Sequence, residues 1–393
     1  MNDKSKNKML LILGLMIFLA NGDNYAVAPL IINISRDLNI SISTAALSVT
    51  AYMTSFGVFT LIFGPLSDRY GKAKIINIAA VGTAIFSILG ATAFNLPSLL
   101  FFRAMNGAFG AGIFPVTLAL VGETFDEQNR QKSIAKILSF SFLGSATATI
   151  IGGFIAYYAS WRMVYLVYGL AELSLAIVML KMLQRDKPVT SQLRILSSYK
   201  EALSHKEFWK VLTLLLFVGI AVFGSFTYSG QLIKEATSYS VLAVGLILSL
   251  FGIGTLVAGK WTNLIKSRLN NMFLPMAGLI GAASLLILSR ATNVLVLGSS
   301  FFFFGTAFIF IQPTLIAKTQ ELLSGMKGTA MALASFCVFG GGAIGTTLNG
   351  FILDNYGISI IFIISSVLIL MTGILGGILS GIFNSQTIAT EVE

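Results

Sequence analysis

The chain has 393 residues, a formal net charge of +10 and a mean hydropathy of +0.85. Charged residues make up 11% of it, whereas soluble globular proteins have roughly 25%. Too few polar residues are present to cover a soluble core of this size, so a soluble domain is excluded. The apolar runs are continuous rather than alternating, which predicts membrane-spanning helices and not barrel strands.

In chain order, the hydropathy pattern predicts an all-α membrane protein with twelve transmembrane helices. The first apolar run is too long for the core of a signal peptide, and further spans follow it. The predicted spans are 9–32, 45–66, 75–95, 98–122, 133–157, 162–183, 209–231, 240–262, 272–290, 293–318, 325–350 and 357–383.

The distribution of basic residues predicts the orientation of these helices. With the amino terminus in the cytoplasm, only Arg36, Arg162, Lys234 and Arg290 fall on the outer side, and Arg103 lies within a span. The other Lys and Arg residues are cytoplasmic, as the positive-inside rule requires. An even number of spans then places the carboxyl terminus inside as well. The positive charge therefore indicates membrane topology, and we expect no nucleic-acid partner.

The longest loop, 184–208, contains charges, serines and Pro188, and we interpret it as a cytoplasmic linker between six-helix bundles at 1–183 and 209–393. The two bundles read as repeats in the same orientation. A shift of 197 residues maps Gly144 to Gly341, and a shift of 198 maps Gly107 to Gly305, Pro115 to Pro313 and Glu123 to Glu321.

The stretch Gly64–Lys72 reads GPLSDRYGK, and we interpret it as a short charged loop between two apolar spans. It resembles the cytoplasmic loop signature of the major facilitator superfamily, G-x-L-[AS]-D-R-x-G-[RK]-[RK]. A degraded counterpart follows Gly259, with Asn263 in place of Asp68. The resemblance implies two bundles that rock around a substrate bound between them.

By the same resemblance, this stretch is a gating loop that docks near Ser324–Lys327, at the start of the eleventh helix, in the outward-facing state. We expect Gly64 and Gly71 to permit its tight backbone path. The alternative is a solvated loop that only obeys the positive-inside rule. The gating residues implied are Gly64, Asp68, Arg69, Gly71 and Lys72.

Two further motifs resemble the drug:proton antiporter branch of the superfamily. LLFFRAMNG, Leu99–Gly107, is similar to the fourth-helix signature L-x-x-x-R-x-x-Q-G, whose arginine is implicated in proton transfer; Asn106 replaces the glutamine. Residues 144–153 resemble the antiporter signature G-x-x-x-G-P-x-x-G-G, with Ala148 and Thr149 in place of the Gly-Pro pair.

Three charged residues lie well within predicted spans, where charges are costly and by default suggest function: Asp23, Arg103 and Glu172. At 1.5 Å per residue, Asp23 lies roughly 20 Å from the inner end of its helix and Arg103 roughly 8 Å from the outer end of its own. In a core about 30 Å thick these depths nearly coincide. We therefore predict an Asp23–Arg103 pair that couples transport to protons; a static pair or a contact for a cationic substrate are the alternatives.

Glu172 is central in the sixth span, which in this family usually supports the bundle. We favour a structural or unknown role for this possible intramembrane acid, with attraction of cationic substrates as the alternative. Family analogy places the substrate cavity among helices 1, 4, 7 and 10, although phenylalanines are also ordinary lipid-facing residues. The candidates are Asn21, Tyr25, Asn106, Phe109, Phe223, Phe226, Tyr228, Phe308 and Gln312.

These observations predict a proton-driven exporter of small amphipathic molecules in the bacterial cytoplasmic membrane. The alternatives are a dedicated exporter of one metabolite (a sugar, an amino-acid derivative or a metallophore) and an uptake symporter or uniporter on the same fold. A membrane enzyme is disfavoured because no nucleotide loop, catalytic triad or metal-ligand cluster is visible. We expect no cofactor and no metal, a monomer, and substrate, protons and lipids as partners.

Overall fold

The computed structural model describes residues 3–183 and 195–392, which form helices joined by short turns. In the first half the helices are α1 (Asp3–Tyr25), α2 (Ile31–Asp37), α3 (Ile42–Tyr70), α4 (Lys72–Gly90), α5 (Leu96–Gly110), α6 (Phe114–Thr124), α7 (Glu127–Tyr158) and α8 (Trp161–Met182). The remainder are α9 (Ile195–Ala202), α10 (Lys206–Val218), a π-helical turn (Gly219–Phe223), α11 (Gly224–Thr237), α12 (Val241–Leu269), a 3-10 turn (Asn270–Met272), α13 (Phe273–Leu288), α14 (Val294–Leu322), a 3-10 turn (Ser324–Met326), α15 (Lys327–Tyr356) and α16 (Ile358–Val392).

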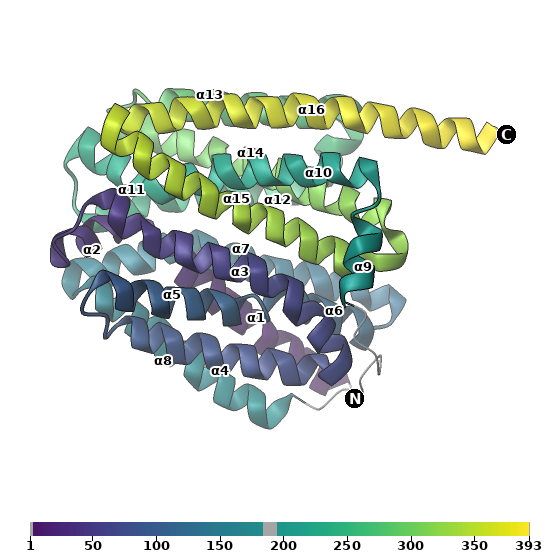
Figure 1. Cartoon of the computed structure of the whole chain (residues 1–393), viewed down its shortest axis with the longest axis horizontal. Coiled ribbons are helices and arrows are strands. Elements are labelled where there is room, and N and C mark those ends of the chain that lie inside the picture. The colour runs from purple at the N-terminus through teal and green to yellow at the C-terminus, as the bar shows by residue number, and fades with distance from the viewer. Residues whose placement is uncertain (1–2, 184–194, 393) are drawn as a thin grey trace.

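The helices of the two halves lie in two groups that meet along α3, α7, α12 and α15. In Figure 1 the first group is purple to blue-green and the second is teal to yellow. Across the junction, α3 packs on α15 and α7 packs on α12. The start of α1, the short helix α9 and the end of α16 lie at one end of the molecule (Figure 1).

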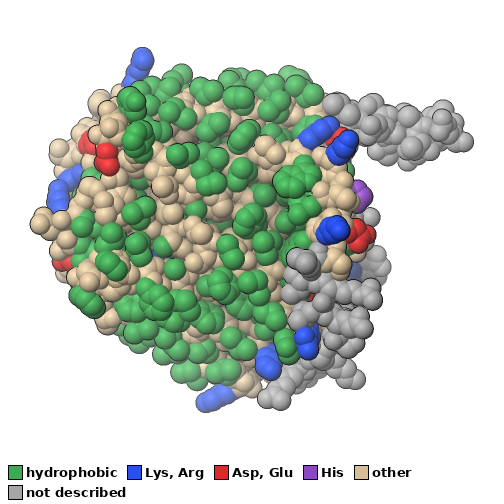
Figure 2. Space-filling view, viewed as in Figure 1, with side chains coloured by type: hydrophobic (Ala, Val, Ile, Leu, Met, Phe, Trp, Pro, Cys, Tyr) green, Lys and Arg blue, Asp and Glu red, His purple; other side chains and the backbone are tan. Residues whose placement is uncertain are grey.

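The surface carries the apolar band that a membrane requires. Figure 2 shows hydrophobic side chains across the middle of the visible face, with charged side chains gathered toward its two ends. Within the described residues, ten helical runs are long and apolar enough to span a membrane. One of them, Val241–Leu288, contains two of the predicted spans, whereas α1 is not among the ten. The all-α membrane fold is thus confirmed, and the count of twelve spans stays a prediction.

Three predicted spans are not single uninterrupted helices. The prediction of one helix over 9–32 is wrong, because α1 ends at Tyr25 and a turn precedes α2; Pro29 in this turn cannot donate a backbone hydrogen bond. The span predicted at 98–122 breaks between α5 and α6, where Pro115 occupies the first turn of α6. The span at 209–231 contains the π-helical turn, a feature often found at functional sites.

The internal repeat is visible in how the helices cross. A Cβ atom added at Gly107 would overlap the carbonyl oxygen of Tyr52 on α3, and one added at Gly305 would overlap that of Phe251 on α12. Gly144 and Gly341 repeat this arrangement against the carbonyl oxygens of Phe18 and Leu216. Small residues at helix crossings let membrane helices approach closely. The matched glycines in the sequence therefore mark equivalent crossings.

The division into bundles at 1–183 and 209–393 remains a prediction. Of the linker predicted at 184–208, residues 184–194 lie outside the described residues. The described part contains α9, whose Tyr199 hydroxyl donates to the Leu61 carbonyl oxygen on α3 at 2.7 Å. Burial raises the pKa of Tyr199 to about 12, so the hydroxyl stays protonated and available as this donor.

Candidate functional site

The structure brings Asp23 and Arg103 together inside the first half. Asp23 lies near the end of α1 and Arg103 in the middle of α5, and both are buried. Arg103 Nη1 lies 3.6 Å from Asp23 Oδ2. A buried charge is retained in a protein when a partner compensates it, so each of these side chains depends on the other.

Arg103 is also held by neutral groups. Its Nη1 donates to Asn106 Oδ1 at 3.1 Å, and Asn106 Nδ2 donates to the Thr83 carbonyl oxygen on α4 at 3.1 Å. The guanidinium carbon lies 4.4 Å from the ring centroid of Tyr52 and 5.3 Å from that of Tyr165. Cation–π contacts of this kind stabilise a desolvated arginine. Sequence reasoning missed both tyrosines, because a tyrosine in an apolar span gives no signal of what its ring faces.

Glu172 belongs to the same buried cluster. It lies on α8, one turn after Tyr168, whose ring packs directly on Gly22 of α1. Its side chain is 0% exposed and interacts electrostatically with Asp23 and Arg103. Within the described residues neither carboxylate oxygen of Glu172 has a hydrogen-bond partner. We call Asp23, Arg103 and Glu172 the charged cluster.

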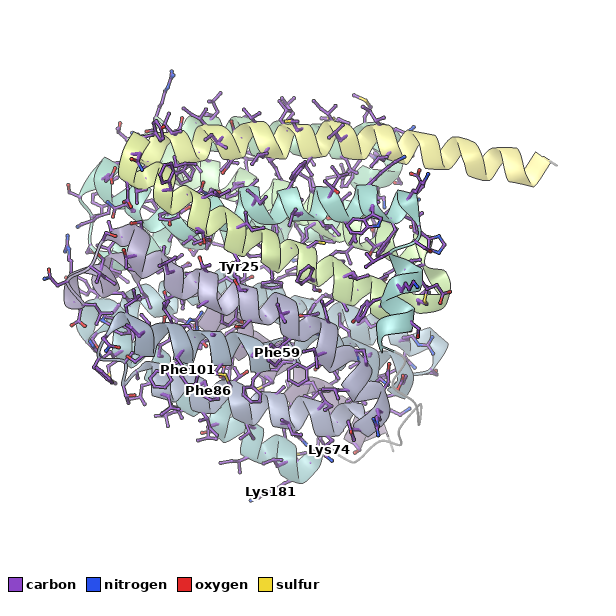
Figure 3. The ribbon with its side chains drawn as sticks, in the orientation of Figure 1. Tyr25, Phe59, Lys74, Phe86, Phe101 and Lys181 are labelled. Carbon is purple, nitrogen blue, oxygen red and sulfur yellow. The ribbon has the colours of Figure 1, made fainter. Side chains whose placement is uncertain are left out.

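Four of the predicted cavity residues come together at the junction of the halves. The Tyr25 ring lies 6.2 Å from that of Phe223 and 5.8 Å from that of Phe226, centroid to centroid. Phe223 in turn lies 5.8 Å from Phe308 on α14. Figure 3 places Tyr25 between the two groups of helices. We call Tyr25, Phe223, Phe226 and Phe308 the aromatic cluster.

The aromatic cluster is closed. The cavity beside Tyr25, Phe223 and Phe226 has a volume of about 20 Å³. That is space for about one water molecule and not for a solute. The rings therefore fill the position that family analogy gives to the substrate.

The other cavity candidates lie elsewhere. Asn21 donates a hydrogen bond to Ser141 on α7, and Asn106 accepts one from Arg103. Phe109 stacks on Phe86 and lines a groove between α4, α5 and the end of α8, away from the junction of the halves. The hydroxyl of Tyr228 donates to the Thr346 carbonyl oxygen at 2.9 Å, and Gln312 is partly buried on α14, one turn after Phe308.

The two halves are in contact at one end and separated at the other. At the end predicted to be outside, Ser43 Oγ on α3 donates to Asp354 Oδ2 on α15 at 2.7 Å, and the hydroxyls of Thr50 and Thr347 lie 3.2 Å apart. At the end predicted to be inside, a cavity of about 380 Å³ lies between α3, α6, α9 and the start of α15. A cavity of this size can hold a small molecule.

The loop interpretation of Gly64–Lys72 is wrong. Helix α3 continues to Tyr70 and α4 starts at Lys72, so only Gly71 is non-helical, with φ of 93°. Gly71 is needed there because side chains rarely tolerate that backbone conformation. Gly64 is helical, and a Cβ added to it would meet nothing within 4 Å. The prediction that Gly64 serves a tight backbone path is therefore also wrong.

The charges of this stretch pair with the first half itself. Lys72, 1% exposed, lies 3.1 Å from Asp68 and 2.9 Å from Glu123 on α6, whereas the guanidinium of Arg69 lies over the Tyr70 ring. Asp68 and Lys327 line the 380 Å³ cavity, and the docking near Ser324–Lys327 predicted for the outward-facing state stays a prediction. Sequence reasoning used Glu123 only as a repeat marker and missed it as a partner of Lys72.

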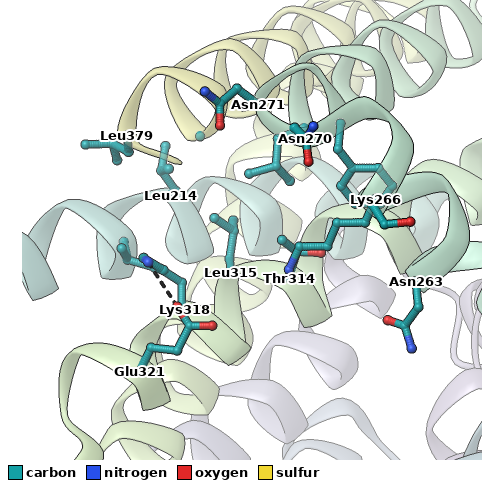
Figure 4. Close-up of a pocket in the computed structure, with 15 residues that line it drawn as sticks. Leu214, Asn263, Lys266, Asn270, Asn271, Thr314, Leu315, Lys318, Glu321 and Leu379 are labelled. Atoms are coloured by element: carbon teal, nitrogen blue, oxygen red, sulfur yellow. Dashed lines mark hydrogen bonds and ion pairs between the residues drawn. The ribbon is translucent and has the colours of Figure 1, made fainter. Parts of the chain in front are cut away.

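The corresponding region of the second half is built differently. Figure 4 shows a cavity of about 390 Å³ in which Lys318 pairs with Glu321, one turn away on α14, at 2.9 Å. Asn263 and Lys266, from the degraded counterpart of the signature, line the same cavity. The Lys318–Glu321 pair joins two residues of α14, whereas Lys72 joins the start of α4 to Asp68 on α3 and Glu123 on α6.

The sequence profile described as Major Facilitator Superfamily matches residues 13–346. The chain belongs to the major facilitator superfamily. Among members of this superfamily, it is 26% identical to multidrug resistance protein D of Escherichia coli (strain K12), over 83% of this chain and 84% of that protein. It is 22% identical to the MFS-type transporter YceJ of Bacillus subtilis (strain 168), over 86% of this chain and 88% of that protein.

Solved structures share the fold of this superfamily member. A bacterial homologue of the human lysosomal transporter Spinster, inward-facing and unoccupied, has a TM-score of 0.78 at 14% identity, covering 98% of this chain and 99% of that one. The nucleoside transporter NupG has a TM-score of 0.78 at 12% identity, covering 94% and 99%. The family prediction is confirmed, and the chain is a multi-pass membrane transporter rather than an enzyme.

Proposed function

We propose that this transporter exports small amphipathic molecules in exchange for protons, by alternating access between the two halves. The buried Asp23–Arg103 pair carries the proposal. A carboxylate in this position attracts Arg103 only while it is ionised, so binding a proton removes the attraction. In a medium of low polarity such a change in charge is large enough to alter helix packing.

The position of Asp23 suggests how this change reaches the substrate path. Asp23 lies two residues before Tyr25, at the end of α1, and Tyr25 contacts Phe223 and Phe226 of the second half. A shift of the end of α1 therefore moves a ring of the aromatic cluster. Protonation of Asp23 and opening of the aromatic cluster would be linked through Tyr25 and its contacts with Phe223 and Phe226.

Arg103 has partners that do not depend on the proton. Asn106, Tyr52 and Tyr165 keep contact with the guanidinium when Asp23 is neutral. The arginine can then remain buried through the cycle while its attraction for Asp23 is switched on and off.

The proposed substrate class rests on the aromatic cluster and the inner cavity. Aromatic rings bind flat and amphipathic solutes by stacking and dispersion, and cations by cation–π contact. A 380 Å³ cavity open at the predicted inner end is suited to loading from the cytoplasm. The similarity to multidrug resistance protein D supports efflux. Export of a single metabolite, or uptake on the same fold, remains the alternative to be tested.

We propose further that the transporter works as a monomer in the bacterial cytoplasmic membrane, with both termini in the cytoplasm. The proton gradient would supply its energy without any cofactor or metal. Its partners would then be the transported solute, protons and the surrounding lipids.

Everted membrane vesicles test this function, with ethidium as the probe. Respiration acidifies their interior, so an antiporter takes ethidium up and releases protons from the interior. We expect ethidium to reverse the quenching of a pH-gradient dye in vesicles with the wild-type protein. Asp23→Asn should reduce both signals to the level of vesicles without the transporter, because an amide cannot carry the proton.

Asp126→Asn is the matched control, since Asp126 is exposed before α7, and it should transport like wild type. Ethidium uptake that is indifferent to uncouplers and pH would contradict proton coupling. Competition by chemically unrelated solutes would support a multidrug role, whereas inhibition by one compound class alone would favour a dedicated exporter.

A further inference from the structure

The charged cluster contains two acids and only one base. Asp23, Arg103 and Glu172 are each 2% exposed or less, so water does not solvate their charges. If both carboxyls were ionised, one negative charge would remain without a counterion inside the membrane. Such a charge is costly, and a buried group avoids the cost by binding a proton. One proton therefore belongs to the resting cluster.

The contacts of the Asp23 and Glu172 carboxyls indicate which of them holds this proton. Asp23 has Arg103 Nη1 at 3.6 Å, which stabilises its ionised form. In the described part of the chain neither carboxyl receives a hydrogen bond on its oxygens, so the ion pair with Arg103, which Asp23 has and Glu172 lacks, distinguishes the two acids. The proton consequently resides on Glu172 while Asp23 is paired.

Glu172 has two charged neighbours in the described part of the chain, Asp23 and Arg103. Asp23 comes from α1 and Arg103 from α5, and both act on Glu172 electrostatically. The titratable neighbours are Tyr168 on α8 itself and Tyr52 on α3. Among the described residues, Arg103 is thus the cation that acts on Glu172.

We propose that Glu172 is a second proton-binding group, which is protonated while Asp23 pairs with Arg103 and ionises to replace Asp23 when Asp23 becomes neutral. In the exchange, the O–H bond at Glu172 breaks, its proton is transferred to a carboxylate oxygen of Asp23, and an O–H bond forms there. Arg103 keeps one carboxylate partner in both states, and the cluster never holds a net charge. The second proton site deepens the proposed function. Its existence does not depend on that function, but the use of its proton in transport does.

Infrared spectroscopy of the full-length protein in liposomes tests the inference without any substrate. The C=O stretch of a protonated carboxyl is separate from the bands of ionised ones. We expect the wild type at neutral pH to show a protonated-carboxyl band that Glu172→Gln removes and Glu172→Asp shifts. We expect Asp23→Asn to abolish the band too, because Glu172 then ionises to compensate Arg103.

Glu235→Gln, at an exposed acid on α11, is the control and should leave the band unchanged. A glutamate with a purely structural role would keep its proton in Asp23→Asn, so persistence of the band in that variant overturns the inference. So does a wild-type spectrum without a band that depends on Glu172. If Glu172→Gln does not fold, Glu172→Asp and Asp23→Asn still decide.

The same liposomes separate this inference from the proposed function. The expected bands without proton-driven ethidium uptake would retain the second proton site and overturn the antiport. Uptake that depends on Asp23, together with a band indifferent to the Asp23→Asn change, would retain the antiport and overturn the role of Glu172.

Discussion

The two halves of this transporter share their helix crossings, yet the first half buries charges where the second half buries apolar groups. Gly107 and Gly305 make equivalent crossings, and the same shift of 198 residues aligns Arg103 with Phe301 and Asp23 with Ala221. A shift of 197, which aligns the starts of α8 and α16, places Ile369 opposite Glu172. Phe301, Ala221 and Ile369 are all buried.

This difference indicates that the architecture folds without buried charges. In the described residues the buried charged side chains are Asp23, Lys72, Arg103 and Glu172, all from the first half. The second half forms the same crossings without them. Replacing buried ion groups by well-packed apolar residues is often neutral or stabilising. The charged cluster is therefore better explained by transport than by stability.

The largest effect is expected when the three charged residues of the first half are replaced by their second-half counterparts. The triple variant Asp23→Ala, Arg103→Phe, Glu172→Ile should lose proton-driven transport completely. Its free energy of unfolding should be unchanged or higher by about 1–4 kcal/mol, because no buried charge remains to be desolvated. Thermal unfolding in detergent and ethidium uptake in vesicles measure the two effects. A triple variant that fails to insert, or melts well below wild type, would make the cluster structural.

A second test asks whether the shared crossings are equally tight. Gly107→Ala and Gly305→Ala should each destabilise the protein by about 1–3 kcal/mol, since the new methyl group meets a backbone carbonyl that cannot rotate away. Gly64→Ala is the control and should not destabilise, because open space surrounds that position. Thermal unfolding compares the three variants. A large effect at only one of the two crossings would break the equivalence of the halves.

The smallest expected difference concerns the inner ends of the halves. Lys72→Gln should cost about 1 kcal/mol, because Lys72 bridges two helices from a buried position. Loss of the Lys318–Glu321 pair in Lys318→Gln should cost about 0.3–0.5 kcal/mol, because Glu321 is 61% exposed and the pair lies within one helix turn. Unfolding curves recorded at low and high salt measure both. Equal losses of stability in the two variants would mean that the Lys72 bridge does not stabilise the packing of α4 against α3 and α6.

Hydropathy, glycine spacing and the signature motif were enough to predict the family and the helical fold. They failed at Gly64–Lys72 because a charged stretch between apolar runs looks the same whether it is a loop or the adjoining ends of two helices. The breaks after Tyr25 and Gly110 were missed because apolar composition continues across them. Only tertiary packing distinguishes these cases.

Within the site, helix depth alone predicted that Asp23 and Arg103 could approach each other. Depth could not assign Glu172 to the same cluster, since that requires knowing which face of α8 meets α1. Likewise, phenylalanine is common throughout the apolar spans, so no pattern separates Phe223 at the junction of the halves from Phe109 in the groove between α4 and α5. Rotation about a helix axis is the information that the composition of a span lacks.

The closed aromatic cluster sets a limit on how tightly a solute can bind. Tyr25 already contacts Phe223 and Phe226, so a solute that enters must exchange ring–ring contacts for ring–solute contacts. Only the difference between the two contributes to affinity. On the proposed function, a bound solute would separate the two halves at these rings, and one that fits the rings only slightly better than they fit each other would be released readily.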